Sequence, residues 1–500
     1  MIATFAAWLV ISFVCWAWGY AFLAFTNKAA DGPAKPFSLV CLTGFAVIAA
    51  AASVVSLFAK VGVLLFLFFL VLSSGLFLVR GTWEALKQNL RTVFSLSPPF
   101  LLLLFVSSLL VMVMSVWHII HPDTIEYHAA IIKSVKEFGV IKGYANENVR
   151  YGLQSNWFVA CALFSFNFSG LHALTYANSI VLIWFLHYAI TLLSRSAQQN
   201  LPLHVLPGII FLGLAFLDFN QIRITSVSAS PDFVAAIYVL LAVYLFIDRA
   251  PTACVLSIAL FSATAITFKL SSAPVAIIPL LMLVKQRSLQ RLFPVILITA
   301  LPVLPFLLRN FFTSGYVLFP ATAPYMGGPH WQLEASVLQQ VSDYITAYAR
   351  TASPADAEAV RETLKIPFQK WLPVWWSLRN PGQKILLTLS IATLFTAVFF
   401  IRKVFGLLVG NQRLALVIAG IALVSWFTLA PDPRFATAWL VLFNLLIIYS
   451  LVSQKKGSTL YQKTAVGIAY GLSLGLFIYC AFRLLRYFDL YNILLPYGLQ

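Results

Sequence analysis

Charged side chains are scarce in this sequence. Only 10% of the 500 residues are Asp, Glu, Lys or Arg, while 61% are hydrophobic. Soluble domains carry about 25% charged and about 45–50% apolar residues, so the composition excludes a soluble globular protein. A membrane span takes about 20 apolar residues. The length therefore leaves room for many spans and one modest loop domain.

The alternation of apolar and polar residues that marks a membrane β-barrel is also lacking. Residues 61–79 and 100–116 are apolar almost without interruption, which is typical of helical spans. We therefore expect an all-α polytopic membrane protein with about 14 transmembrane helices. Polar interruptions place them at 2–25, 37–59, 61–79, 99–119, 171–194, 205–222, 233–248, 253–268, 273–285, 292–308, 385–401, 413–430, 435–452 and 464–485.

Cysteine pairs and basic clusters are missing too. The cysteines stand singly, without a CxxC spacing or a paired histidine, so neither a disulfide framework nor a zinc site is indicated. The formal charge of +17 is spread along the chain, and the largest basic clusters are the pairs 402–403 and 455–456. Nucleic-acid binding needs a basic patch or stripe, so we expect no nucleic-acid partner.

The sidedness of the spans depends on residues 152–170. Their apolar part, 157–166, is too short to cross a bilayer, so we expect an interfacial or re-entrant helix there. If this helix crosses instead, every later loop changes sides. With the amino terminus outside and this helix not crossing, the inside loops carry most of the net positive charge, as the positive-inside rule requires. These loops are 26–36, 80–98, 195–204, 248–252, 285–291, 402–413 and 453–463.

Ionisable residues near the span ends gather on the outer side in this topology. Charged groups at membrane depth are costly and tend to mark function, so we expect a single outward-facing site. The residues concerned are Asp123 and Glu126 after span 99–119, Arg223 and Asp232 before span 233–248, Lys269 after span 253–268, Arg309 after span 292–308 and Arg434 before span 435–452.

Residues 121–138 begin this outer site. After Asp123 and Glu126 we expect an amphipathic helix that lies flat on the outer interface and ends at Gly139. Two interpretations of the carboxylates stay open. Either Asp123 is an exposed general base, or Asp123 and Glu126 form a capping box. His128 is likewise either a site residue or an edge residue of the apolar helix face.

The following residues are rich in side chains that suit sugars. Asn, Gln, Tyr, Trp and Arg are dense in 142–157. Such side chains hydrogen-bond and stack on sugar rings, although Tyr and Trp also form interfacial aromatic belts. The candidate sugar or acceptor contacts are Tyr127, Arg150, Gln154, Asn156 and Trp157.

Asp232 and Lys269 each have two interpretations. Asp232 is a second carboxylate of the outer site, or it belongs to the N-terminal cap of its span, where Pro231 suits the first turn. Lys269 is a cation of the site, or a snorkelling anchor that ends a span of small and apolar residues. The sequence leaves both pairs of alternatives open.

A long outer loop, 309–384, separates two expected spans. We expect two helices in it, at 335–349 and 354–364, the second started near Ser353 with Asp356 at capping-box spacing. Tryptophans then anchor the return to the membrane. The loop is long enough for a lid over an outer cavity but too short for an independent enzyme domain.

Three short segments, 122–128, 309–320 and 431–435, resemble motifs of a known superfamily. An acidic residue just beyond a span, a further outer acid, a late lid loop and an arginine in a proline-rich turn together resemble the GT-C membrane glycosyltransferases, in a bacterial branch. The family usually has two adjacent acids in the first outer loop. Here Asp123 and Glu126 are separated by two residues, so only Asp123 is carried over.

The resemblance covers roughly 99–450 and implies a GT-C-like fold and activity. In such an enzyme a sugar moves, with inversion, from a polyprenyl-phosphate donor to a hydroxyl of a lipid, glycan or protein acceptor, and Asp123 acts as general base. A divalent cation, Mg²⁺ or Mn²⁺, is an open requirement. The implied phosphate-binding residues are Lys269, Arg309, Arg434 and Arg223, and the implied assisting residues, with or without a metal, are Glu126, His128 and Asp232.

The resemblance divides the chain into four regions. We expect three accessory spans in 1–98, which depart from the family, then a catalytic core in 99–308 with a first outer loop at 120–156. The lid loop 309–384 and the C-terminal spans in 385–500 complete the chain. The expected location is the bacterial inner (plasma) membrane, as a multi-pass protein with its active site facing the periplasm or exterior.

Two other functions stay open. One is a polysaccharide polymerase or ligase that acts on lipid-linked glycans, which also uses outer arginines and many spans. The other is a lipid-sugar flippase or transporter. Transporters commonly show internal repeats with paired broken spans, and the sequence shows no convincing repeat of this kind.

Overall fold

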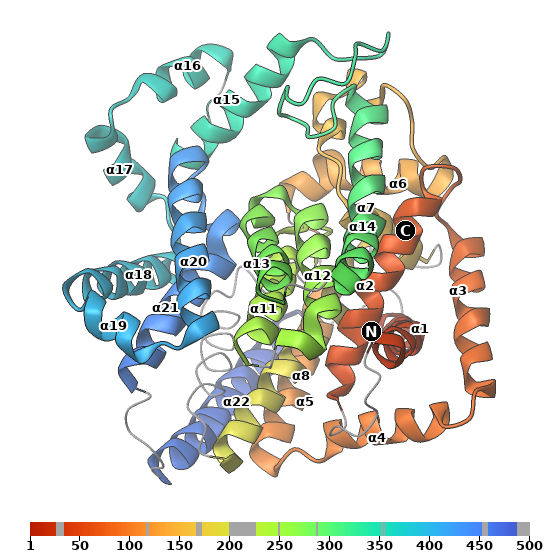
Figure 1. Cartoon of the computed structure of the whole chain (residues 1–500), viewed down its shortest axis with the longest axis vertical. Helices are drawn as coiled ribbons and strands as arrows, with labels where there is room; N and C mark the ends of the chain where they lie inside the picture. The colour runs from red at the N-terminus through yellow and green to blue at the C-terminus, as the bar shows by residue number, and fades with distance from the viewer. Residues whose placement is uncertain are drawn as a thin grey trace.

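The computed structural model describes residues 1–26, 35–116, 119, 121–166, 173–199, 227–248, 251–286, 289–351, 354, 356–452 and 459–487. All regular secondary structure in these residues is helical, which confirms the expected all-α class. Figure 1 shows most of the long helices packed side by side, with α15, α16 and α17 at one end.

The long helices form the body of the molecule. They are α1 (Ile2–Thr26), α2 (Phe37–Val55), α3 (Val63–Gly75) with η1 (Leu76–Leu78), α5 (Pro98–Ser115), α8 (Tyr176–Gln199), α11 (Asp232–Asp248), α12 (Pro251–Phe268), η6 (Leu270–Ala276) with α13 (Ile277–Gln286), α14 (Leu289–Ser314), α18 (Pro381–Phe399), α20 (Gly410–Leu429), α21 (Pro433–Val452) and α22 (Thr459–Tyr487).

Shorter helices connect them. They are α4 (Thr82–Phe94), the π-helical turn η2 (Thr124–His128), α6 (Ala129–Glu137), η3 (Tyr144–Asn146), η4 (Val149–Gly152), α7 (Asn156–Phe164), α15 (Ala335–Thr351), α16 (Ala357–Lys365), α17 (Phe368–Ser377) and α19 (Ile401–Leu407). The two helices expected in the long outer loop are therefore present as α15 and α16.

The chain is a polytopic helical membrane protein. In its described part, eight helices are long and apolar enough to cross a membrane, or nine if α3 and α4, which bend by 104°, count as one broken span. A helix or a pair of adjoining helices lies at each expected span except 205–222, which lies outside the described residues. The figure of about 14 crossings stays a prediction.

Two glycines set the distance between α1 and α2. Gly19 of α1 faces Gly44 of α2, and a Cβ atom on Gly19 would overlap the carbonyl oxygen of Val40. A Cβ atom on Gly44 would overlap the carbonyl oxygen of Cys15 in the same way. Small residues let two membrane helices approach closely at the backbone. This close pair therefore depends on both positions lacking a side chain.

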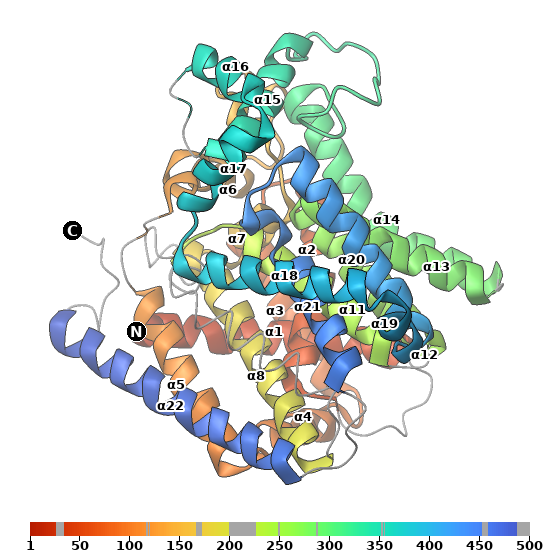
Figure 2. The same cartoon turned by 90° about the vertical axis from the view of Figure 1, so that its left-hand side faces the viewer.

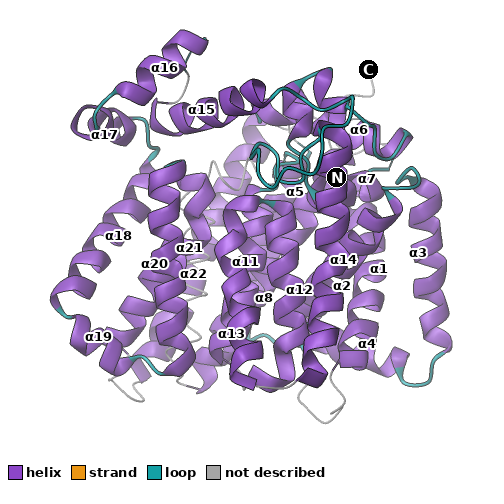
Figure 3. Cartoon of the chain, turned by 45° about the horizontal axis from the view of Figure 1, so that its top comes forward, coloured by secondary structure: helices purple, strands orange, loops and turns teal. Residues whose placement is uncertain are grey.

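The molecule has two different ends. Figure 3 shows α6, α15, α16 and α17 at one end of the bundle, and α4 and α19 at the other. Figure 2 shows α6, α15, α16 and α17 gathered at the same end from a second direction. We call this the lid end. The chain segments of α4 and α19 belong to the expected inside loops 80–98 and 402–413, so the lid end corresponds to the expected outer side.

Helix α7 explains the ambiguous stretch 152–170. It has nine residues, all buried, and at 1.5 Å per residue spans only about 13 Å. The hydroxyl of Thr175, just before α8, donates to the carbonyl oxygen of Ser115 at the end of α5 (3.4 Å). The end of α5 and the start of α8 therefore lie at the same end of the bundle, as expected for a stretch that does not cross, and α7 is a short buried helix.

Candidate functional site

Four of the expected site residues meet at the lid end, each placed there by a helix terminus. Asp123 precedes η2, Asp232 is the first residue of α11, Lys269 follows α12, and Arg434 lies in the first turn of α21. The Lys269 ammonium contacts the Asp232 carboxylate, and the two side chains are 21% and 14% exposed. Helices that run in alternating directions thus bring distant sequence positions to one end.

Arg434 is held by its own turn. Its Nε atom donates to Oδ2 of Asp432 (3.1 Å), and its backbone N–H donates to Oδ1 of the same carboxylate (2.9 Å). The turn is fixed from both sides by indole groups. Trp375 of α17 donates to the carbonyl oxygen of Pro431 (2.6 Å), and Trp426 of α20 donates to that of Asp432 (2.7 Å). The prolines and these bonds together fix the direction of the Arg434 side chain.

One aromatic ring lies against both cations of the site. The Nζ atom of Lys269 is 4.1 Å from the centroid of the Phe435 ring, and Cζ of Arg434 is 5.5 Å from the same centroid. Tyr348 of α15 adds a second ring, 5.9 Å from Cζ of Arg434. Aromatic faces attract cations without neutralising them. The lid helix α15 therefore contributes directly to the surroundings of Arg434.

Asp123 differs from the other carboxylates of this cluster. Its backbone is helical (φ −58°, ψ −29°), and its side chain caps no backbone N–H, so the capping-box interpretation does not describe it. Asp232 pairs with Lys269 and Asp432 with Arg434, whereas the described residues offer the Asp123 carboxylate no hydrogen bond or ion pair. Its lone pairs are therefore available to accept a proton.

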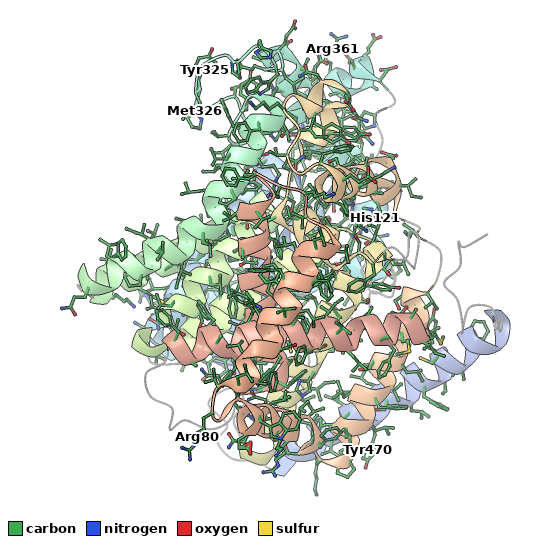
Figure 4. The ribbon with its side chains drawn as sticks, turned by 90° about the vertical axis from the view of Figure 1, so that its right-hand side faces the viewer. Arg80, His121, Tyr325, Met326, Arg361 and Tyr470 are labelled. Carbon is green, nitrogen blue, oxygen red and sulfur yellow. The ribbon has the colours of Figure 1, made fainter. Side chains whose placement is uncertain are left out.

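Two stacked imidazoles lie beside these charges. The rings of His121 and His128 have centroids 5.7 Å apart at an interplanar angle of 23°. Figure 4 labels His121 between Arg361, toward the lid helices, and Arg80 at the opposite end. Burial lowers the pKa of His121 even though Asp123 and Asp232 act to raise it. Burial, together with the neighbouring His121, also holds the pKa of His128 well below its usual range. Both rings are therefore neutral near pH 7.

Tyr127 lies against the same charges. Burial raises the pKa of its phenol well above the usual range, and the nearby Asp123 and Asp232 carboxylates raise it further. Its phenol therefore stays protonated at physiological pH and keeps one O–H donor for a hydrogen bond. The ring packs edge to face against His128, with centroids 4.3 Å apart.

Glu126 and Arg150 form an ion pair with each other. The side chains of Arg150 and Glu126 are 39% and 48% exposed, and exposed pairs of this kind add little stability. Gln154 is buried and donates from Nε2 to the carbonyl oxygen of Tyr151 (2.7 Å). The expected sugar-binding segment is thus divided into an exposed charged pair and a buried stretch.

Arg309 lies apart from the cluster, in a buried pocket of neutral oxygens. It is 1% exposed, and its NH2 group donates to Oγ of Ser56 (2.6 Å) and to the carbonyl oxygen of Ser53 (3.4 Å) at the end of α2. Its NH1 group donates to Oδ1 of Asn156 (3.3 Å). Trp157 is fully buried next to Asn156 and donates to the carbonyl oxygen of Ala229 (2.9 Å). The polar side-chain groups of these three expected site residues bond to other parts of the protein, except Nε of Arg309, which is buried and has no partner among the described residues.

Arg223 lies outside the described residues. Sequence reasoning assigned no role to three residues that the structure adds to the cluster, namely His121, Asp432 and Phe435. The first two had a signal, because each is an ionisable residue beside a proline at a span end. Phe435 had none, since aromatic residues make up 15% of the chain.

A metal site is not formed by the described side chains as they stand. Within the described ranges, no group of three or more His, Cys, Asp and Glu side chains has the arrangement of a metal site. Asp232 is already paired with a lysine, and Glu126 with an arginine. The expected assisting residues Glu126, His128 and Asp232 therefore do not converge on one point.

Comparison with known protein families gives one match. A family model described as a domain of unknown function, DUF8201, matches residues 1–441. The chain belongs to this family. The DUF8201 match runs from the amino terminus into α21, so it includes Asp123, Asp232, Lys269 and Arg434 within one domain. No curated protein and no solved structure matches the chain.

Proposed function

We propose that this chain is a membrane glycosyltransferase that transfers a sugar from a polyprenyl-phosphate donor to an acceptor hydroxyl at the lid end. The observation that carries the proposal is an unpaired carboxylate, Asp123, that acts electrostatically on Arg434 in a cluster whose two cations, Arg434 and Lys269, keep unused N–H donors. In the described structure, the guanidinium of Arg434 hydrogen-bonds only through Nε, and the ammonium of Lys269 only to Asp232. A candidate base and two candidate anion-binding groups thus belong to one cluster.

The reaction balances with these groups. The acceptor oxygen attacks the anomeric carbon of the sugar, and the bond between that carbon and the phosphate oxygen breaks. The hydroxyl proton passes to Asp123 as general base. The electron pair leaves with the phosphate, whose charge Lys269 and Arg434 stabilise, the arginine as a fork and the lysine as a point charge. One displacement inverts the anomeric configuration.

The proposal includes a location and a topology. We place the chain in the bacterial inner membrane with about 14 crossings in a GT-C-like arrangement and with the lid end facing the periplasm. Helices at the expected span positions and basic loops at the end opposite the lid support this orientation. A lipid-linked donor fits a site at the ends of membrane helices, because its phosphate lies at the headgroup level.

Accessibility of new cysteines tests the orientation. The five native cysteines are buried, so an added surface cysteine is the main target for a membrane-impermeant thiol reagent. Ser336→Cys at the lid end should react in intact cells. Lys403→Cys at the opposite end should react only after the membrane is opened. The reverse pattern would overturn the orientation.

The decisive test compares two carboxylates in the same turn. Purified protein is given polyprenyl-phosphate sugars, and released polyprenyl phosphate is measured by mass spectrometry. Asp123→Asn should lower the rate about 10²–10⁴-fold, the usual contribution of a general base. Glu126→Gln, whose carboxylate is exposed and paired with Arg150, should retain most of the activity. Equal activity of Asp123→Asn and wild type would overturn the proposal.

The same assay separates the competing functions. A polymerase or ligase would extend or move whole glycan chains, so the acceptor products would differ in length. A flippase would move lipid-linked sugars across reconstituted vesicles without releasing polyprenyl phosphate. A need for Mg²⁺ or Mn²⁺ is tested by adding a chelator to the assay.

A further inference from the structure

One buried polar atom of the cluster has no partner. His121 is 4% exposed, and its Nδ1 atom makes no hydrogen bond with any described residue. Buried polar atoms in native proteins are almost always hydrogen-bonded, and an exception calls for an explanation, of which a ligand that supplies the partner is one. Leaving such an atom unpaired lowers the stability of the folded protein, because the atom has lost its hydrogen bond to water.

The neighbouring imidazole shows that the segment can satisfy a histidine. The hydroxyl of Thr124 accepts from the backbone N–H of Ala229 (3.3 Å) and lies 3.2 Å from Nδ1 of His128. The hydroxyl can donate to this nitrogen or accept from it, depending on the tautomer of His128. The same turn therefore gives Nδ1 of His128 a hydrogen-bond partner and leaves Nδ1 of His121 without one.

The groups around His121 indicate the kind of ligand that it faces. Asp123, Asp232, Arg434 and Lys269 all act electrostatically on its ring. Arg434 and Lys269 have N–H donors to spare, as described above. A neutral imidazole can add one further donor without adding charge. Lys269 and Arg434 are each paired with one carboxylate, Asp232 and Asp432, so it is their spare N–H donors, together with one neutral N–H, that suit the oxygens of a phosphate group.

We propose that Nδ1 of His121 carries a proton and donates a hydrogen bond to a phosphate oxygen of the ligand, which completes a phosphate site with Lys269 and Arg434. The inference rests on the proposed function in one respect, because it takes the phosphate to be that of the lipid donor. Burial lowers the pKa of His121, so the donor is the neutral ring. Asp123 then remains free to accept a proton from the acceptor hydroxyl.

Three substitutions separate contact at Nδ1 from other roles. The amide nitrogen of His121→Asn reaches the position of Nδ1, whereas that of His121→Gln reaches the position of Nε2. His121→Phe keeps an aromatic ring against His128 but has no donor. The Asn and Gln variants are both uncharged amides, so they remain a matched pair even if the Phe variant folds poorly.

Binding of undecaprenyl phosphate to the full-length protein in detergent is the measurement. Wild type and His121→Asn should bind with affinities within about threefold, and His121→Gln and His121→Phe should bind about tenfold or more weakly, since a hydrogen bond to a charged group is lost. Undecaprenol, which lacks phosphate, should bind all four proteins alike. Inorganic phosphate that binds as tightly as the lipid would identify a free phosphate as the ligand.

The outcomes distinguish this inference from the proposed function. If wild type releases polyprenyl phosphate from the donor but His121→Phe binds undecaprenyl phosphate like wild type, the inference fails and the function stands. If only the Phe and Gln variants lose binding while wild type transfers no sugar, the phosphate site stands and the function fails. Equal loss in the Asn and Gln variants would overturn the contact at Nδ1. No binding by wild type would overturn both.

Discussion

The ammonium of Lys269 lies 4.1 Å from the centroid of the Phe435 ring. Lys269 follows α12 and Phe435 lies in the first turn of α21, so this contact joins two helices that are distant in the sequence. Lys269 is already paired with the carboxylate of Asp232. The ring holds the same cation in position without adding a second negative charge.

Phe435→Leu should therefore weaken phosphate binding. The change removes the aromatic face from Lys269 and Arg434 but keeps an apolar side chain of similar reach. A cation–π contact contributes about 0.5–2 kcal/mol, so the Kd for undecaprenyl phosphate should rise by roughly two- to thirtyfold. Phe435→Tyr keeps the ring and is the control. An unchanged Kd in Phe435→Leu would show that the ring has no part in holding the cations.

The stacked histidines predict a loss of stability in acid. Burial lowers the pKa of His121 and of His128 below the ordinary value of 6.5. Below about pH 6.5 the unfolded chain therefore binds more protons at these residues than the folded chain does. The stabilising effect is complete above this pH and is lost as the pH falls toward the lowered folded values.

Thermal unfolding measures this effect. Between about pH 7.5 and about pH 5.5, the Tm of wild type should fall more than that of His128→Phe, which cannot take up a proton at this position. The phenylalanine keeps the aromatic packing against Phe158, whose ring centroid is 4.8 Å from that of His128. Parallel declines of Tm in the two proteins would contradict the buried neutral state.

Arg309 should prove important for stability and not for phosphate binding. Arg309→Ala leaves the oxygens of Ser53, Ser56 and Asn156 without their donor in a buried place. We expect a loss of at least about 2 kcal/mol in the free energy of unfolding. The Kd for undecaprenyl phosphate should stay within about threefold of wild type.

Arg434→Lys is the comparison for Arg309→Ala, because it should change phosphate binding and leave stability nearly unchanged. It keeps the positive charge beside Asp432 but loses the planar fork of the guanidinium, so phosphate binding should weaken with little change in Tm. A variant Arg309→Ala with normal Tm and lost phosphate binding would restore Arg309 to the site.

The close approach of α1 and α2 gives a prediction about the fold. Gly44→Ala puts a methyl group against the carbonyl oxygen of Cys15, so the two helices must separate. We expect a lower Tm and a smaller yield of folded protein in detergent. Gly420→Ala in α20 is the control, because no other group lies within 4 Å of its added Cβ atom. Equal behaviour of the two variants would mean that α1 and α2 are not packed at these glycines.

The sequence predicted the helices well, because long apolar runs leave the backbone few alternatives in a membrane. Their ends were less certain. The second lid helix was expected to start near Ser353, but α16 begins at Ala357 with Asp356 as its N-cap, which accepts from the N–H of Ala359 (2.8 Å). Gly139, expected to end the helix after Glu126, does follow α6 and has a positive φ of 82°.

The sequence predicted the site residues that are ionisable and lie at span ends. It did not predict which of these residues packing would bury away from the site. Asp123, Asp232, Lys269 and Arg434 were all singled out as ionisable residues at span ends, and the structure brings them together. Arg309 has the same sequence signal, yet it binds backbone and hydroxyl oxygens of neighbouring helices. Only the tertiary arrangement of α2, α7 and α14 distinguishes these two uses of an arginine.

Helix α4 has the form of a helix that lies along a membrane surface. It turns by 104° from the preceding helix, exposes Trp83, and is joined to α1 through the hydrogen bond from Trp16 to Asn89 (3.0 Å). An amphipathic helix of this kind rests at the boundary of one leaflet. Asp123 lies at the lid end, away from α4. The thickness of the hydrocarbon layer therefore sets how far the headgroups of the lid-end leaflet lie from Asp123. Acyl chains that are too short or too long would therefore hold a lipid phosphate away from the site, and turnover in reconstituted vesicles would peak at one chain length.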